Sequence, residues 1–179
     1  MYGKINLNGV WAFGLASDEK RYSAKIPSCN FEDLIKNNLI EDPFYKKNEE
    51  KCQWVGDEDF CYERAFEITE DEFREEHIVL NAKMLDTLCD VFVNGQKVGE
   101  GKNAYIGYEF DIKNAVTAGE NKIKIIFHSP VKYVKKMQEQ DKTPHNCNGI
   151  DGVPHIRKPA CHFGWDWGSV IPLSGIVKD

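Results

Sequence analysis

The 179-residue sequence lacks any apolar run of about 20 residues, the length that a membrane-spanning helix needs. It also lacks, after Met1, the apolar stretch that marks a secretory signal peptide. These absences lead us to expect a cytoplasmic protein with no membrane partner.

Basic charge is also scarce, because 23 Lys and Arg residues stand against 29 Asp and Glu residues and leave a net charge of −6. Nucleic-acid-binding domains concentrate basic residues in a patch or stripe. The short run of Lys132, Lys135 and Lys136 is more typical of the solvated face of a helix. We therefore expect no nucleic-acid partner.

The six cysteines include no Cys-x-x-Cys pair, which argues against a thioredoxin-like site or a zinc ribbon. A domain of this size does not need disulfides for stability, so we expect free thiols. One group of possible zinc ligands remains near the end of the chain: His145, Cys147, His155, Cys161 and His162. Its spacing matches no zinc finger, so a metal-binding loop is a less favoured alternative, and we predict no metal or other cofactor.

Hydrophobic residues alternate with polar ones in several short segments, a pattern typical of half-buried β-strands. These segments are 60–68, 78–82, 91–93, 108–112 and 123–127. Asn94-Gly95 is a strong hairpin signal, because both residues tolerate a positive φ. Short strands joined by such turns predict an all-β fold, an antiparallel jelly-roll β-sandwich.

Three sites carry helix-start signals, so a few short helices are expected beside the strands. Asn30 is a candidate N-cap, and Thr69 with Glu72 has the spacing of a capping box. Ser129-Pro130 combines a cap residue with a proline at the first helical position.

The strand pattern disappears between residues 138 and 174. Residues 141–152 are polar and rich in Asn, Gly and Pro, which predicts a mobile loop. Long loops inside compact domains are commonly functional, so we expect 138–174 to be a long loop that carries the site.

Within that segment, two of the four tryptophans, Trp165 and Trp167, flank a single aspartate, Asp166. An indole offers a flat apolar surface for the C–H face of a sugar. An ionised carboxylate accepts strong hydrogen bonds from adjacent hydroxyls. The motif suits a carbohydrate pocket, but these residues alone also suit core packing with Asp166 capping a turn.

Further motifs run along the chain in a fixed order: Leu7-Asn8-Gly9-Val10-Trp11, Asp42-Pro43-Phe44-Tyr45, Leu85-Asp86-Thr87-Leu88, Gly119-Glu120-Asn121 and the stretch from Phe163 to Gly168. Together they resemble the amino-terminal domain of β-mannosidases in glycoside hydrolase family 2. Val177 and Lys178 depart from the usual tryptophan and arginine of that family. These departures bear on the packing of the last strand more than on the resemblance to that family.

The resemblance implies a galactose-binding-like β-sandwich domain spanning 1–179, a fragment of a longer glycosidase. Immunoglobulin-like domains and a catalytic (β/α)8 barrel with both catalytic carboxylates would follow it in the parent chain. This domain would be non-catalytic and would help shape the subsite for the terminal non-reducing β-D-mannose of a β-mannoside or manno-oligosaccharide. The parent would be a glycoside hydrolase, whereas the 179-residue chain alone is expected to be inactive.

Carried onto this sequence, the resemblance implies that Asp166 bonds hydroxyls of the sugar and that Trp165 and Trp167 wall the pocket. Four residues are secondary candidates for substrate binding: Arg157 as a partner of Asp166, His162, Asn48 and Trp54. We expect Phe44 and Tyr45 to plug the sandwich end. The alternative function is a free-standing carbohydrate-binding module, whose complete site would bind sugar without any further domain.

Overall fold

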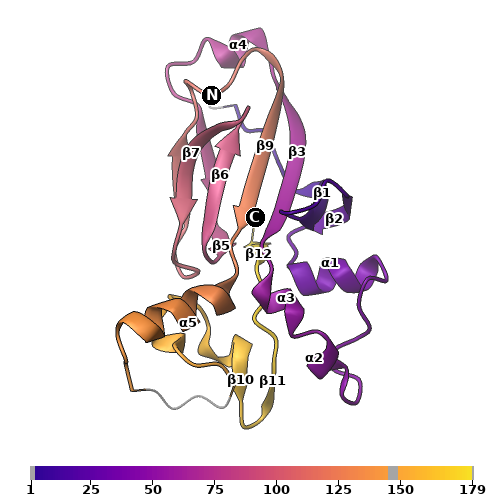
Figure 1. Cartoon of the computed structure of the whole chain (residues 1–179). Helices are drawn as coiled ribbons and strands as arrows, with labels where there is room; N and C mark the ends of the chain where they lie inside the picture. The colour runs from indigo at the N-terminus through magenta and orange to yellow at the C-terminus, as the bar shows by residue number, and fades with distance from the viewer. Residues whose placement is uncertain (1–2, 145–148, 179) are drawn as a thin grey trace.

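The computed structural model describes residues 3–144 and 149–178 (Figure 1). Its strands are β1 (Gly9–Leu15), β2 (Tyr22–Ile26), β3 (Phe60–Ile68), β4 (Val79–Ala82), β5 (Met84–Asp86), β6 (Cys89–Val93), β7 (Gln96–Gly101), β8 (Tyr108–Asp111), β9 (Gly119–Phe127), β10 (Phe163–Trp165), β11 (Gly168–Val170) and β12 (Gly175–Lys178). Its helices are α1 (Asn30–Lys36), α2 (Asn48–Lys51), α3 (Trp54–Asp57), α4 (Glu70–Phe73) and α5 (Pro130–Gln140), with 3-10 turns η1 (Val153–His155) and η2 (Ala160–His162).

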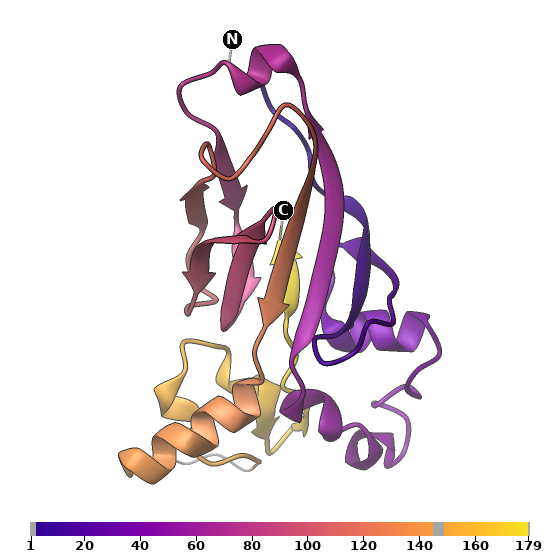
Figure 2. The ribbon, with the colours of Figure 1, turned by 45° about the horizontal axis from the view of Figure 1, so that its top comes forward.

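The strands form two layers, as the alternating pattern predicts. One layer is a six-stranded antiparallel sheet in the order β2-β1-β3-β9-β6-β7. The antiparallel pairs β5–β12 and β4–β8 form the other, and Figure 2 shows β12 behind β9. Buried residues from both layers and from α1 make the main core, among them Phe13, Phe31, Tyr62, Leu85, Val91, Ile125, Phe127 and Ile176. The predicted all-β antiparallel sandwich is confirmed.

The centre of the large sheet is the long pairing of β3 with β9, which runs from Phe60 opposite Phe127 to Ile68 opposite Gly119. Tyr62 is fully buried there, and its ring centroid lies 5.0 Å from that of Phe13. Such aromatic pairs contribute about 0.5–1.5 kcal/mol beyond their buried area. The alternation of large side chains in β3 therefore accounts for its central position.

The predicted hairpin turn and two of the three predicted caps are present in the structure. Asn94 and Gly95 join β6 to β7 with φ values of 49° and 81°, in the left-handed region that a tight hairpin requires. Thr69 and Glu72 form the predicted capping box of α4. Ser129 caps α5 by accepting a hydrogen bond from the backbone N–H of Lys132 at 3.0 Å.

The predicted cap of α1 is wrong by one residue, because Cys29 occupies the N-cap position. Asn30 instead accepts a hydrogen bond at its Oδ1 from the backbone N–H of Ser174, 2.9 Å away. This bond ties the start of α1 to the segment before β12. The contact spans 144 positions, so no local pattern could reveal it.

The segment 138–174 differs from the predicted long loop, since α5 extends into it and η1, η2, β10 and β11 follow. Strands of three residues are too short to show an alternating pattern, which is why the sequence concealed the hairpin. Residues 145–148, inside the loop expected to be mobile, lie outside the described part of the chain, so that expectation stays a prediction. Among the helices of the described residues, none combines the length and hydropathy of a membrane span.

A second, smaller core fixes the place of this segment. It joins α5 to η1 and β10 through Leu88, Val131, Val134, Val153, Ile156 and Phe163. Figure 1 shows α5 and the β10–β11 hairpin together at the end of the molecule opposite α4. The tryptophan motif is therefore held beneath the sandwich, at the same end as α2 and α3.

Candidate functional site

The Trp165-Asp166-Trp167 motif occupies the tip of a short β-hairpin. Phe163 pairs with Val170 and Trp165 with Gly168, so Asp166 and Trp167 form the two-residue turn. Gly164 has a φ of 96°, and a Cβ there would lie 2.7 Å from a methyl group of Val170. Both features require glycine at this position.

The tip is open to solvent. Trp165 is 42% exposed and Trp167 is 75% exposed, and the Asp166 side chain is exposed between them. This exposure rules out the alternative in which the two indoles pack in the core. No hydrogen bond or ion pair engages the Asp166 carboxylate within residues 3–144 and 149–178, so it caps no turn there. An unengaged carboxylate between two flat apolar rings can accept hydroxyl hydrogen bonds while the rings cover C–H groups.

The base of the hairpin is firmly attached. The backbone N–H of Ile171 donates to the carbonyl oxygen of His162 at 2.9 Å. Gln53 donates from Nε2 to the carbonyl oxygen of Val170 at 3.0 Å and to that of Glu49 at 2.8 Å. Because Gln53 lies between α2 and α3, these bonds connect the hairpin to both short helices.

Two secondary candidates lie on those helices, and the structure separates their roles. Trp54 begins α3, directly after Gln53, and is 39% exposed. Figure 1 shows α3 at the same end of the molecule as the hairpin. Asn48 is buried and donates from Nδ2 to the carbonyl oxygen of Asp42 at 3.0 Å. Trp54 is thus available to a ligand, whereas the amide of Asn48 holds the loop before α2.

Phe44 and Tyr45, expected to plug the sandwich end, are 74% and 60% exposed. Both lie in the loop that Asn48 holds, since the Asn48 backbone N–H donates to the carbonyl oxygen of Tyr45 at 3.1 Å. Their exposure adds two aromatic surfaces that sequence reasoning missed as candidate site residues. Two adjacent aromatic residues in the short motif Asp42-Pro43-Phe44-Tyr45 were the sequence feature that could have marked them as candidates.

Arg157 does not pair with Asp166 in the structure. Its side chain is exposed, and its carbonyl oxygen accepts a hydrogen bond from the backbone N–H of Ala104 at 2.9 Å. No ion pair joins Arg157 to Asp166 in the part of the chain that the structure describes. The hypothesis that Arg157 orients Asp166 therefore gains no support from the geometry.

His162 faces inward at the base of the hairpin. Its Nδ1 lies 3.7 Å from Oδ2 of the buried Asp86. Burial and the ammonium charge of Lys158 lower the pKa of His162 to about 4, against the opposing charge of Asp86. His162 is therefore neutral near pH 7.

The possible metal ligands do not come together where the structure describes them. His155 has its Nε2 3.0 Å from Oε1 of Gln138, and Cys161 is exposed. No group of three or more His, Cys, Asp or Glu side chains with metal-site geometry occurs among the residues described. His145 and Cys147 lie outside them.

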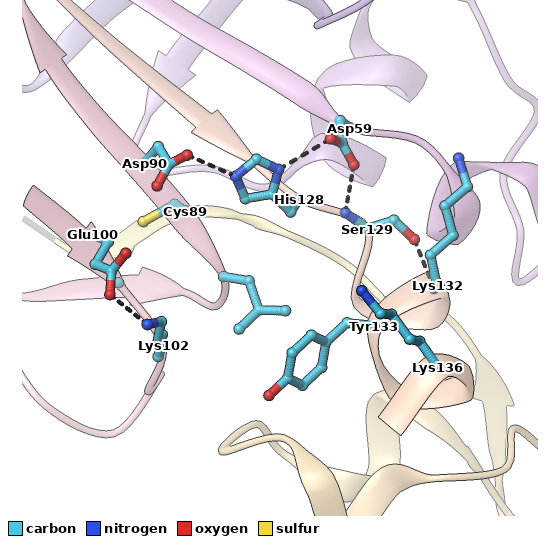
Figure 3. Close-up of a pocket in the computed structure, with 12 residues that line it drawn as sticks. Asp59, Cys89, Asp90, Glu100, Lys102, His128, Ser129, Lys132, Tyr133 and Lys136 are labelled. Atoms are coloured by element: carbon cyan, nitrogen blue, oxygen red, sulfur yellow. Dashed lines mark hydrogen bonds and ion pairs between the residues drawn. The ribbon is translucent and has the colours of Figure 1, made fainter. Parts of the chain in front are cut away.

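A separate hollow of about 330 Å³ lies between α5 and the ends of β6 and β7 (Figure 3). His128 sits at its edge, with Nδ1 3.0 Å from Asp59 and Nε2 3.1 Å from Asp90. Burial alone would lower the pKa of His128, but the hydrogen bonds and charges of both carboxylates raise it. Figure 3 shows Tyr133 and Glu100 on opposite sides of the hollow.

No residue of the tryptophan hairpin lines this hollow, so it is distinct from the hairpin tip. The sequence carried no signal for it, because its lining comes from several separated segments of the chain.

Comparison with known proteins gives consistent matches along the chain. The family model described as "Glycosyl hydrolase 2 galactose-binding domain-like" matches residues 11–178. The β-mannosidase of Bos taurus is 32% identical over 98% of this chain and 21% of its own length. A probable β-mannosidase of Caenorhabditis elegans is 31% identical over 96% of this chain and 20% of its own length.

Solved structures of glycosidases also match this chain. The β-D-mannosidase of Dictyoglomus thermophilum superposes with a TM-score of 0.90 at 35% identity, over 97% of this chain and 22% of the other. A β-D-glucuronidase of the same organism gives a TM-score of 0.55 at 25% identity, over 72% of this chain and 20% of the other. This chain thus spans about a fifth of the length of the proteins it matches.

Proposed function

Because the chain belongs to the glycosyl hydrolase 2 galactose-binding domain-like family, we propose that it serves a longer β-mannosidase as a non-catalytic, sugar-facing domain. In this proposal Asp166 accepts hydrogen bonds from hydroxyls of the terminal non-reducing β-D-mannose. Trp165 and Trp167 wall the same subsite. Trp54 lies at the same end of the molecule and is a further contact.

One observation carries this proposal: the Asp166 carboxylate stands exposed at a hairpin tip between two exposed indoles, with no bonding partner among the described residues. Large exposed apolar side chains gathered at one place are typical of binding surfaces. Here the two exposed indoles neighbour, in the sequence, an exposed carboxylate that can accept hydrogen bonds from adjacent hydroxyl groups. Sugars combine such hydroxyls with apolar C–H faces, which matches the chemistry of the tip.

The proposal leaves bond breaking to the rest of the polypeptide. A retaining glycosidase needs an acid/base and a nucleophile about 5–5.5 Å apart, in a site that encloses the scissile bond. Asp166 is placed instead at an open tip, where it can hold a hydroxyl. The remaining length of the matched relatives, about four fifths, offers room for the catalytic domain.

The test is Asp166→Asn in the natural-length protein, assayed on an aryl β-mannoside. We expect kcat/KM to fall about 10- to 100-fold, the loss typical of one hydrogen bond to a charged group. The matched control is Asp71→Asn in α4, at the opposite end of the molecule, where the side chain is 92% exposed. This control should keep full activity. An unchanged kcat/KM for Asp166→Asn would overturn the proposal.

A further inference from the structure

Beneath the sandwich, a lysine and an aspartate form an ion pair that is sealed from solvent. Lys158 Nζ lies 2.5 Å from Asp86 Oδ1, and the two side chains are 0% and 1% exposed. Removing two charges from water costs more free energy than burying apolar side chains of the same size. Stability alone therefore does not account for a buried ion pair at this position, where apolar side chains would pack at a lower cost in free energy.

The two partners belong to different kinds of structure. Asp86 ends β5 and pairs with Gly175 of β12, so its backbone is held by the sandwich. The hydroxyl of Thr87 also donates to Oδ1 of Asp86. Lys158 lies between η1 and η2, in the irregular segment that leads to β10. The pair thus attaches the irregular segment to a fixed point of the sheet.

A second residue of that segment converges on the same carboxylate. His162 Nδ1 lies 3.7 Å from Asp86 Oδ2, and both atoms are buried without a hydrogen-bond partner among the residues described. The carbonyl oxygen of His162 closes the base of the hairpin by accepting from Ile171. Asp86 therefore faces both Lys158 and the last residue before the hairpin.

Burial lowers the pKa of both basic side chains that face Asp86. Burial lowers the pKa of the Lys158 ammonium, and the neighbouring Asp86 carboxylate opposes this change. Burial together with the charge of Lys158 keeps His162 neutral near pH 7, since its pKa is lowered to about 4. By distance, the Asp86 carboxylate is thus the partner of Lys158, at 2.5 Å, more closely than of His162, at 3.7 Å.

We propose that Asp86 and Lys158 are positioning residues that hold the β10–β11 hairpin, and with it Asp166, in one orientation against the sandwich. Ile156 and Phe163 also bury this segment in the smaller core, but apolar burial is not directional. A charge-assisted hydrogen bond is stronger than a neutral one and weakens as its distance and angle depart from their preferred values. The assignment of Asp166 to a sugar rests on the proposed function, whereas the positioning of the hairpin does not.

The experiment compares Lys158→Met with the double variant Asp86→Leu/Lys158→Met in the natural-length protein. The single variant leaves a buried carboxylate unpaired and should lower Tm, whereas the apolar pair should restore it. Amide hydrogen exchange in residues 163–170 should accelerate roughly tenfold or more in both variants, because the hairpin loses its attachment. The matched control is Lys51→Met, which breaks an exposed pair with Glu41 and should change neither quantity.

Kinetics separate positioning from simple destabilisation. A destabilised protein loses active molecules, so its apparent kcat falls and its KM stays constant. A protein with a misplaced hairpin should show a raised KM for an aryl β-mannoside at wild-type Tm. Should the double variant not fold, Asp86→Asn/Lys158→Gln makes the same comparison with a neutral hydrogen bond.

A double variant with wild-type Tm and wild-type hairpin exchange would overturn the inference. Because hydrogen exchange requires no sugar, the outcome is independent of the proposed function. Faster hairpin exchange in the double variant, combined with full activity of Asp166→Asn, would keep the positioning pair and reject the sugar contact.

Discussion

Gln53 donates a hydrogen bond to the carbonyl oxygen of Val170 at 3.0 Å, across 117 positions of the chain. This contact brings the start of α3 beside the second strand of the tryptophan hairpin. As a consequence, α3, which begins at Trp54, lies at the same end of the molecule as the β10–β11 hairpin (Figure 1). The exposed aromatic residues of two distant segments thus share one end of the domain.

Replacing Gln53 tests this connection. Gln53→Ala should lower the free energy of unfolding by about 1 kcal/mol, the usual contribution of a neutral, partly buried hydrogen bond. The amide exchange of residues 168–170 should accelerate as the second strand loosens. Urea unfolding and hydrogen exchange measure the two effects. The control Gln96→Ala alters an exposed residue of edge strand β7 and should leave both unchanged.

The two hairpin indoles should matter for binding and little for stability. Trp167 is 75% exposed, so Trp167→Ala should change the free energy of unfolding by less than about 0.5 kcal/mol. In the natural-length protein the same change should raise KM for an aryl β-mannoside. By contrast, Trp11 is 4% exposed, and Trp11→Ala should cost about 3–5 kcal/mol.

Urea midpoints and steady-state kinetics of the two variants provide the comparison. A large loss of stability for Trp167→Ala would contradict the exposed position of its indole. An unchanged KM would contradict its role at the subsite.

His162 should make the protein less stable as the pH falls below about 6.5. Burial and the Lys158 charge lower its pKa from 6.5 to about 4, so between these values the unfolded chain binds a proton that the folded chain refuses. The stabilisation is complete above pH 6.5 and is lost as the pH falls towards 4, by at most about 3 kcal/mol. His162→Gln should flatten this dependence in urea unfolding between pH 4 and 7. If the free energy of unfolding of His162→Gln depended on pH as steeply as that of the wild type, His162 would not be the cause of this dependence.

His128 should act with the opposite sign. Its pKa is raised by Asp59 and Asp90 in spite of burial, so the folded chain keeps its proton at a pH where the unfolded chain releases it. The stabilisation is present below pH 6.5 and is lost as the pH rises through the raised value. His128→Gln should therefore lower stability at pH 5.5 and have little effect at pH 9, as measured by thermal unfolding. An equal loss of stability for His128→Gln at pH 5.5 and at pH 9 would contradict the raised pKa of His128.

The 179-residue chain alone should neither hydrolyse an aryl β-mannoside nor bind mannose at sub-millimolar concentration, because the proposal gives it only one side of the subsite. Mass spectrometry of the assayed sample should show this chain and no other. Turnover by such a sample would contradict the non-catalytic role. Sub-millimolar binding of mannose or mannobiose in calorimetry would favour a free-standing carbohydrate-binding module.

Much of the sandwich was readable in advance from near-neighbour patterns. The alternation around Phe60 and Tyr62 predicted β3, and Asn94-Gly95 predicted the β6–β7 hairpin. These features depend on residues within a few positions of each other, since side-chain period and backbone φ preference are local properties. The chemistry of the Trp165-Asp166-Trp167 motif was readable for the same reason.

Other features appear only when distant segments meet. The pairs Asp86–Lys158 and Asn30–Ser174 join residues 72 and 144 positions apart. The misassigned cap at Asn30 belongs to this class. The hidden hairpin β10–β11 is local in sequence, but it is attached to the domain by a bond of this class from Gln53 to Val170. Short strands and single long-range bonds leave no periodic trace, because their stability comes from the surface on which they pack.

The sequence by itself determined the long central strands, the Asn94-Gly95 turn and the caps at Thr69 and Ser129, and it showed which side chains at 165–167 have the chemistry to contact a sugar. Only the tertiary structure decided that these side chains project from a hairpin tip, that a sealed ion pair lies at its base, and that Trp54 lies at the same end. Local preferences act over a few residues, whereas the direction of a hairpin depends on the packing of segments brought together by the whole fold.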